Sequence, residues 1–110
     1  MKTFNLKDGM PTSDVAILRL KNALRYAKSE KVVKIIHGYG SHGVGGTIRT
    51  VVREELAEML ASRQIKAYIP GEAVSVPMGF DEQIRRYRNM IENDSDFRKG
   101  NDGITYVFFI

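Results

Sequence analysis

Hydrophobic and polar positions follow two distinct periods along the chain, one typical of strands and one typical of helices. Strand-type runs occur at Lys2–Leu6, Val32–His37 and Lys66–Ile69. Between them, apolar residues recur at helical spacing in Asp14–Ser29 and Thr47–Arg63, which predicts two amphipathic helices. Because helical crossovers join these strands, we expect the three strands to be parallel.

The remainder of the chain predicts a further helix and a last strand. Apolar spacing over Phe80–Asn93 is helical, and the polar stretch Asn93–Gly103 predicts a loop. The closing run Ile104–Ile110 is apolar on both faces, which predicts a strand inside the sheet or covered on both sides. The sequence therefore predicts an α/β (α+β) two-layer sandwich: a four-stranded mixed sheet with two main helices on one face, plus a third helix.

Composition narrows the setting of this predicted fold. The 110 residues fit a single domain spanning residues 1–110, and the lack of cysteine excludes disulfides and thiolate zinc sites. No apolar run is long enough to span a membrane, and the N-terminus lacks the apolar core of a signal peptide. We therefore expect a cytoplasmic protein with no membrane partner. The net charge of +4 is compatible with a polyanionic partner without requiring one.

The most informative motif follows the second predicted strand, where Gly38–Gly46 holds five of the ten glycines and leads into a helix. Free N–H groups and the helix dipole make such a place suited to phosphate. Gly38, Gly40 and Gly43 satisfy the dinucleotide pattern G-x-G-x-x-G, but the next strand ends without the acidic residue of that fingerprint. A P-loop would require a lysine where Gly46 stands.

A third interpretation is a site that grips a nucleic-acid backbone. Arg49 and Arg53 lie one helical turn apart, so both can face one phosphate region. His37 and His42 flank the loop, and Tyr39 offers a ring on which a base could stack. His37 could equally hydrogen-bond the loop backbone. A cation in the first turn of a helix opposes the dipole, which indicates a functional reason for Arg49.

These residues resemble a known family. The run His37-Gly38-Tyr39-Gly40, followed by a glycine-bearing loop and Ile48-Arg49, resembles the H-G-x-G…L/I-R signature of the Smr (small MutS-related) domain. The order of elements, the Pro70-Gly71 turn and the closing strand are also similar. The resemblance implies a stand-alone two-layer domain that binds DNA or RNA, with endonuclease or nicking activity in some members. Compared with the family's usual order of elements, the segment from about 72 to about 102 resembles a helical insertion before the last strand.

One departure from the family bears on cleavage. Members usually carry L-D-x-H/R-G near the first strand, and here Asn5 stands at the acidic position and Lys7 at the basic one. An amide is no general base and is a weak metal ligand, so nuclease activity becomes uncertain. If the domain cleaves, His37 is the candidate acid or base and Arg49 the group that stabilises charge on phosphorus.

The sequence assigns no metal-ligand set and no cofactor, and Mg²⁺ or Mn²⁺ would matter only for a nuclease. The candidate nucleic-acid-binding residues are Asn5, Lys7, Gly38, Tyr39, Gly40, His42, Gly43, Gly45, Gly46 and Arg53. Two alternatives stay open. One is a non-enzymatic module whose loop holds a nucleotide or another small phosphate compound, and the other is a protein-interaction module that uses the third helix.

Overall fold

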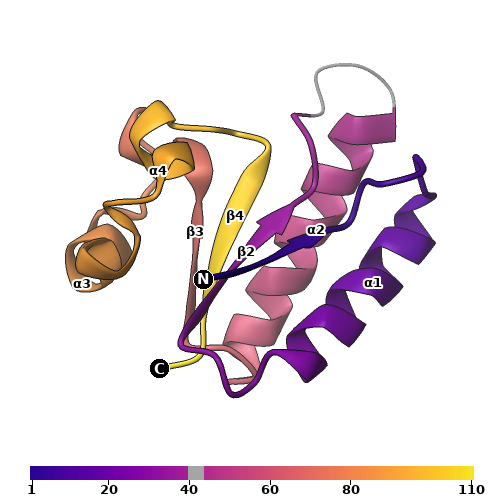
Figure 1. Cartoon of the computed structure of the whole chain (residues 1–110), viewed down its shortest axis with the longest axis horizontal. Coiled ribbons are helices and arrows are strands. Elements are labelled where there is room, and N and C mark those ends of the chain that lie inside the picture. The colour runs from indigo at the N-terminus through magenta and orange to yellow at the C-terminus, as the bar shows by residue number, and fades with distance from the viewer. Residues whose placement is uncertain (40–43) are drawn as a thin grey trace.

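A computed structural model describes residues 1–39 and 44–110, with side chains described from Thr47 onward in the second part. In chain order the elements are β1 (Lys2–Asn5), α1 (Ser13–Tyr26), β2 (Val32–Ile36), α2 (Val44–Ala61), β3 (Ala67–Pro70), the 3₁₀ helix η1 (Gly71–Val74), α3 (Asp81–Ile91), α4 (Ser95–Lys99) and β4 (Ile104–Phe108) (Figure 1). None of the described helices is both long and apolar enough to cross a membrane.

The strands of the described residues form one four-stranded mixed sheet in the order β1-β2-β4-β3. β1 pairs with β2 in parallel, and β4 runs antiparallel to both β2 and β3. β1, β2 and β3 therefore run in the same direction, as their helical crossovers require. β4 is a central strand and all of its residues are buried, which confirms the prediction for the closing run.

Helices cover both faces of this sheet. α1 and α2 lie on one face, and α3 and α4 lie on the other (Figure 1). Leu20, Leu56 and Val107 belong to the hydrophobic core under α1 and α2, while Phe97 and Tyr106 belong to a second core under α3 and α4. The mixed sheet with two main helices on one face is thus confirmed, and α3 and α4 add a third layer to the predicted two.

The turn after β1 is fixed from α1. This helix begins where the Thr12 hydroxyl accepts a hydrogen bond from the N–H of Val15, at 3.4 Å. About two turns into α1, Arg19 donates to the carbonyls of Leu6 at 3.2 Å and Asp8 at 2.6 Å. These bonds hold the segment on which Lys7 lies, at the same end of the sheet as the end of β2.

The predicted loop at 93–103 contains α4 instead. Its Phe97 is buried, and Lys34 of β2 pairs with Asp94 at 2.9 Å and Asp96 at 2.7 Å. Burial alone would lower the pKa of Lys34, but its hydrogen bonds to Asp96 and Asp94 outweigh burial and raise that pKa. A polar segment is therefore fixed to the sheet by an ammonium group shared between two carboxylates.

Replacing Lys34 by Gln should lower the free energy of unfolding by about 2 kcal/mol, because two neighbouring carboxylates lose their cation. The same substitution at exposed Lys31 changes the charge equally and should cost at most about 0.5 kcal/mol. Urea unfolding at pH 7 measures both.

Lys34 lowers the pKa of Asp96, so this stabilisation is present above pH 3.8 and is lost as the pH falls below it. Equal effects of the two substitutions would contradict the prediction.

Candidate functional site

The predicted site lies at the end of the sheet where β2 finishes. β2 ends at Ile36, and α2 begins at Val44, three residues before the predicted start at Thr47. The backbone of Gly45 and Gly46 therefore belongs to α2 and not to a loop. The low helix propensity of glycine had favoured the later start. Three further candidates lie outside the described residues: Gly40, His42 and Gly43.

Gly38 makes the turn that follows β2. Its φ is +88°, a conformation that glycine adopts without strain, and an added Cβ would meet the Cδ of Lys7 at 3.2 Å. The N–H groups of His37 and Gly38 both donate to the carbonyl of Gly103, at 3.0 and 3.1 Å. The turn after β2 is thus held by the turn before β4, and the stem of Lys7 lies against it.

His37 is fully buried and both of its ring nitrogens have partners. Nδ1 lies 3.0 Å from the carbonyl oxygen of Gly38, and Nε2 lies 2.8 Å from the hydroxyl of Thr105. A carbonyl oxygen only accepts, so the geometry assigns the ring proton to Nδ1, and the Thr105 hydroxyl donates to Nε2. The ring is therefore neutral, and both of its nitrogens are hydrogen-bonded to groups of the protein itself.

The charge state of His37 agrees with this bonding. Burial is the main cause that lowers its pKa to about 4, and the nearby guanidinium groups of Arg53 and Arg49 lower it further. Near neutral pH the imidazole is uncharged and has no exposed edge. The structure thus favours the alternative in which His37 bonds the loop backbone, and its acid or base role stays a prediction.

Arg53 is held by an ion pair that the sequence did not reveal. Its Nη1 and Nη2 donate to the two carboxylate oxygens of Glu72 at 2.7 and 2.8 Å, and its Nε donates to the Thr105 hydroxyl at 3.1 Å. Nη2 also donates to the carbonyl of Ile104 at 3.3 Å. The Arg53 side chain is only 16% exposed, so a phosphate contact would require this bidentate pair to open.

Arg49, one turn earlier on α2, is more accessible. Its Nη1 pairs with the carboxylate of Asp102 at 3.2 Å, and the Arg49 and Asp102 side chains are 28% and 44% exposed. Because α2 begins at Val44, Arg49 lies beyond the first turn, and the argument from the helix dipole was wrong. The observed neighbour of its charge is Asp102.

Three candidates lie on the solvent side of the glycine turn. Tyr39 is 61% exposed, and its ring lies beside Gly103, where Cδ1 is 3.4 Å from the position of an added Cβ. Lys7 is exposed, and its ammonium group has no polar partner among the described residues. Asn5 accepts a hydrogen bond from the backbone N–H of Lys7 at 2.9 Å, which makes it a turn-forming residue.

The turn before β4 contributes residues that sequence reasoning missed. Asn101 accepts from the N–H of Gly103 at 2.8 Å and donates to Asp96 at 2.9 Å. Gly71 packs so closely that an added Cβ would lie 2.0 Å from the Asn101 carbonyl oxygen. The sequence Asn101-Asp102-Gly103 is a typical turn signal and could have predicted this tight connection.

No group of three or more His, Cys, Asp or Glu side chains in the described ranges could hold a metal ion. The chain matches no protein-family model, and it shows no significant similarity to a curated protein or a solved structure. The function of the chain therefore has to be inferred from the arrangement of its described residues.

The buried neutral His37 predicts a pH dependence of stability. Its folded pKa of about 4 lies below the ordinary 6.5, so its stabilising contribution is complete above pH 6.5 and is lost as the pH falls toward 4. Between pH 7 and pH 5 the free energy of unfolding should fall by about 2 kcal/mol through this residue. Denaturant unfolding across this range measures the effect.

The control is His37→Gln, which should be less stable at pH 7 but should lack most of this pH dependence. NMR of the wild-type imidazole should show no titration between about pH 5 and pH 8. A ring titration midpoint near the ordinary value, or the same pH dependence in the variant, would contradict the prediction.

Proposed function

We propose that this protein is a nucleic-acid-binding domain of the Smr type, which takes DNA or RNA at the β2–α2 end of its sheet. The observation that carries the proposal is the grouping of a cation, an exposed aromatic ring and a guanidinium group around one glycine turn. These groups belong to Lys7, Tyr39 and Arg49. Hydrogen bonds to the carbonyl of Gly103 hold the turn that carries Tyr39, whereas Lys7 approaches it from the segment after β1 and Arg49 from α2.

The three groups suit two parts of a nucleic acid, its phosphates and its bases. The ammonium of Lys7, which has no polar partner among the described residues, and the accessible guanidinium of Arg49 can neutralise phosphates. Such contacts carry most of the sequence-independent affinity. The exposed ring of Tyr39 can stack on an unpaired base. The net charge of +4 adds a general attraction for a polyanion.

The other named residues support this surface from inside. His37 and Arg53 bond β4 and Glu72, and Asn5 shapes the turn that carries Lys7. The cleavage that the family resemblance implies stays a prediction, because His37 is buried and Asn5 offers no carboxylate. Binding without cleavage is the function that the described geometry favours.

Variants at the site should separate charge from stacking. Arg49→Gln and Lys7→Gln should each weaken binding and reduce the slope of log affinity against log salt by about one. Tyr39→Ala should weaken binding to single strands by about 1–2 kcal/mol and leave the slope unchanged. Fluorescence anisotropy with labelled single-stranded, duplex and branched DNA and RNA, without added metal, measures the affinity and the salt slope of each variant.

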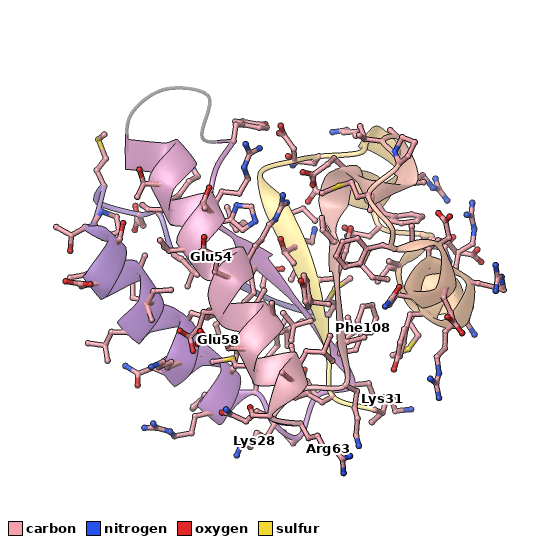
Figure 2. All side chains as sticks on the ribbon, turned by 180° about the vertical axis from the view of Figure 1, so that it is seen from behind. Lys28, Lys31, Glu54, Glu58, Arg63 and Phe108 are labelled. Atoms are coloured by element: carbon pink, nitrogen blue, oxygen red, sulfur yellow. The ribbon has the colours of Figure 1, made fainter. Side chains whose placement is uncertain are left out.

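The matched control is Lys31→Gln, at the opposite end of β2, where it removes the same charge far from the site (Figure 2). Its affinity and salt slope should stay near wild type. Equal losses in Lys31→Gln and Arg49→Gln would reduce the effect to overall charge. Stabilisation by mononucleotides but not by oligonucleotides in a thermal-shift assay would favour the small-phosphate alternative instead.

Asp102 predicts a gain of affinity. Its carboxylate lies where a phosphate would meet Arg49, so ligand and carboxylate compete for one guanidinium group. Asp102→Asn should tighten oligonucleotide binding by about two- to fivefold. Glu58→Gln removes the same charge from an exposed position on α2 and should change affinity less. An unchanged or weaker affinity in Asp102→Asn would show that Asp102 does not compete with the ligand for Arg49.

A further inference from the structure

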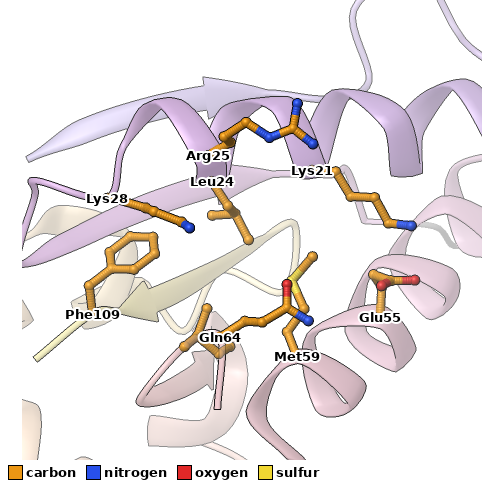
Figure 3. Close-up of a pocket in the computed structure, with 9 residues that line it drawn as sticks. Lys21, Leu24, Arg25, Lys28, Glu55, Met59, Gln64 and Phe109 are labelled. Carbon is orange, nitrogen blue, oxygen red and sulfur yellow. The ribbon is translucent and has the colours of Figure 1, made fainter. Parts of the chain in front are cut away.

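A pocket lies between the C-terminal halves of α1 and α2, at the end of these helices away from the glycine turn (Figure 3). Its volume is about 240 Å³. The apolar part of its lining comes from Leu24, Met59, Ile65 and Phe109, of which the first three are buried. The pocket therefore joins the hydrophobic core to the surface, and an apolar group could enter it.

Three cations, two on α1 and one just after its end, surround the mouth of this pocket. Lys21, Arg25 and Lys28 all line it and are all exposed. None of the three makes an ion pair or a side-chain hydrogen bond with another described residue. Figure 3 shows the Lys28 ammonium directed over the pocket beside Phe109. Three positive charges thus lie over an apolar surface, and in the described part of the chain no anion bonds them.

The charges nearby extend this positive region. Lys28 and Arg63 lie at the same end of the molecule in Figure 2. Glu55 is the one carboxylate among the pocket-lining residues, and it forms no ion pair with another described residue. The cations outnumber it, so the mouth of the pocket has a positive potential that falls off within a Debye length of about 10 Å.

We propose that this pocket binds a small amphipathic anion, a compact apolar body that carries a single carboxylate. The apolar lining takes the body, and Lys21, Arg25 and Lys28 take the carboxylate. Pockets for drug-sized ligands usually have volumes of about 300–1,000 Å³, and this pocket is somewhat smaller. Its size therefore restricts the apolar body to a short aliphatic chain or one aromatic ring. Glu55 disfavours a second negative charge on the ligand. This site is separate from the proposed nucleic-acid surface.

The test uses octanoate and 4-phenylbutyrate as an aliphatic and an aromatic probe. Titration into ¹⁵N-labelled protein should give saturable shifts at the amides of Leu24, Ile65 and Phe109. Octanamide has the same chain without the charge and should bind at least about fivefold more weakly, the size expected for one partly exposed charge pair. Shifts at Tyr39 and Arg49 should stay small.

Variants then identify the charges that act. Arg25→Gln with Lys28→Gln should weaken octanoate binding by about fivefold or more. The control is Arg85→Gln with Arg86→Gln, which removes the same charge from exposed positions of α3 on the opposite face of the sheet. It should change the affinity by less than about twofold.

Three results would overturn the proposal. The first is the absence of saturable amide shifts with either probe up to about 10 mM, a concentration at which even weak binding would be visible. The second is equal binding of octanamide and octanoate, which would leave apolar contact alone. The third is equal weakening by the two double variants, which would reduce the effect to net charge. Each result leaves the oligonucleotide experiments unaffected.

Discussion

A directed series of hydrogen bonds from Arg53 through Thr105 to His37 holds the end of the sheet together. Arg53 donates to the Thr105 hydroxyl, that hydroxyl donates to His37, and the imidazole donates to the carbonyl of Gly38. This direction requires a neutral imidazole, because a protonated Nε2 has no lone pair left to accept the proton of the Thr105 hydroxyl. Burial, which lowers the pKa of His37, therefore also maintains the direction of the bonds. Through Glu72, Arg53 extends this support from α2 to η1.

α4 and the residues that follow it support the same turn from the opposite face of the sheet. Lys34 fixes Asp96, Asp96 accepts from Asn101, and Asn101 accepts from the N–H of Gly103. The carbonyl of Gly103 in turn accepts the two N–H groups that follow β2. A displacement of α4 would therefore reach the glycine turn through consecutive polar contacts. α4 therefore does more in this fold than cover a sheet face, because these contacts hold the backbone from which Tyr39 projects.

Local patterns predicted the frame of this protein well and its polar interior poorly. Periodicity located the strands, the two main helices and the central closing strand, because burial of apolar side chains dictates those patterns. Periodicity missed α4, because this segment is fixed by its ion pairs with Lys34, a residue far away in the sequence. It also missed Glu72 and Asp102 as arginine partners, since ion pairs between residues far apart in sequence leave no local period. His37 shows the same limit: its position was predicted, but its burial depended on Thr105.

The two arginines of α2 show how the partner, and not the spacing, decides what a residue can do. Arg49 and Arg53 lie on one face of one helix, yet Arg53 meets a carboxylate that is only 14% exposed and Arg49 meets one that is 44% exposed. Water screens the second pair strongly and the first pair weakly, so an incoming phosphate can exchange with Asp102 far more easily than with Glu72. Opening the Arg53 pair would also leave Glu72 with an uncompensated charge in a desolvated place. Spacing alone assigned both arginines to the ligand, whereas burial divides them into one that supports the site and one that can bind.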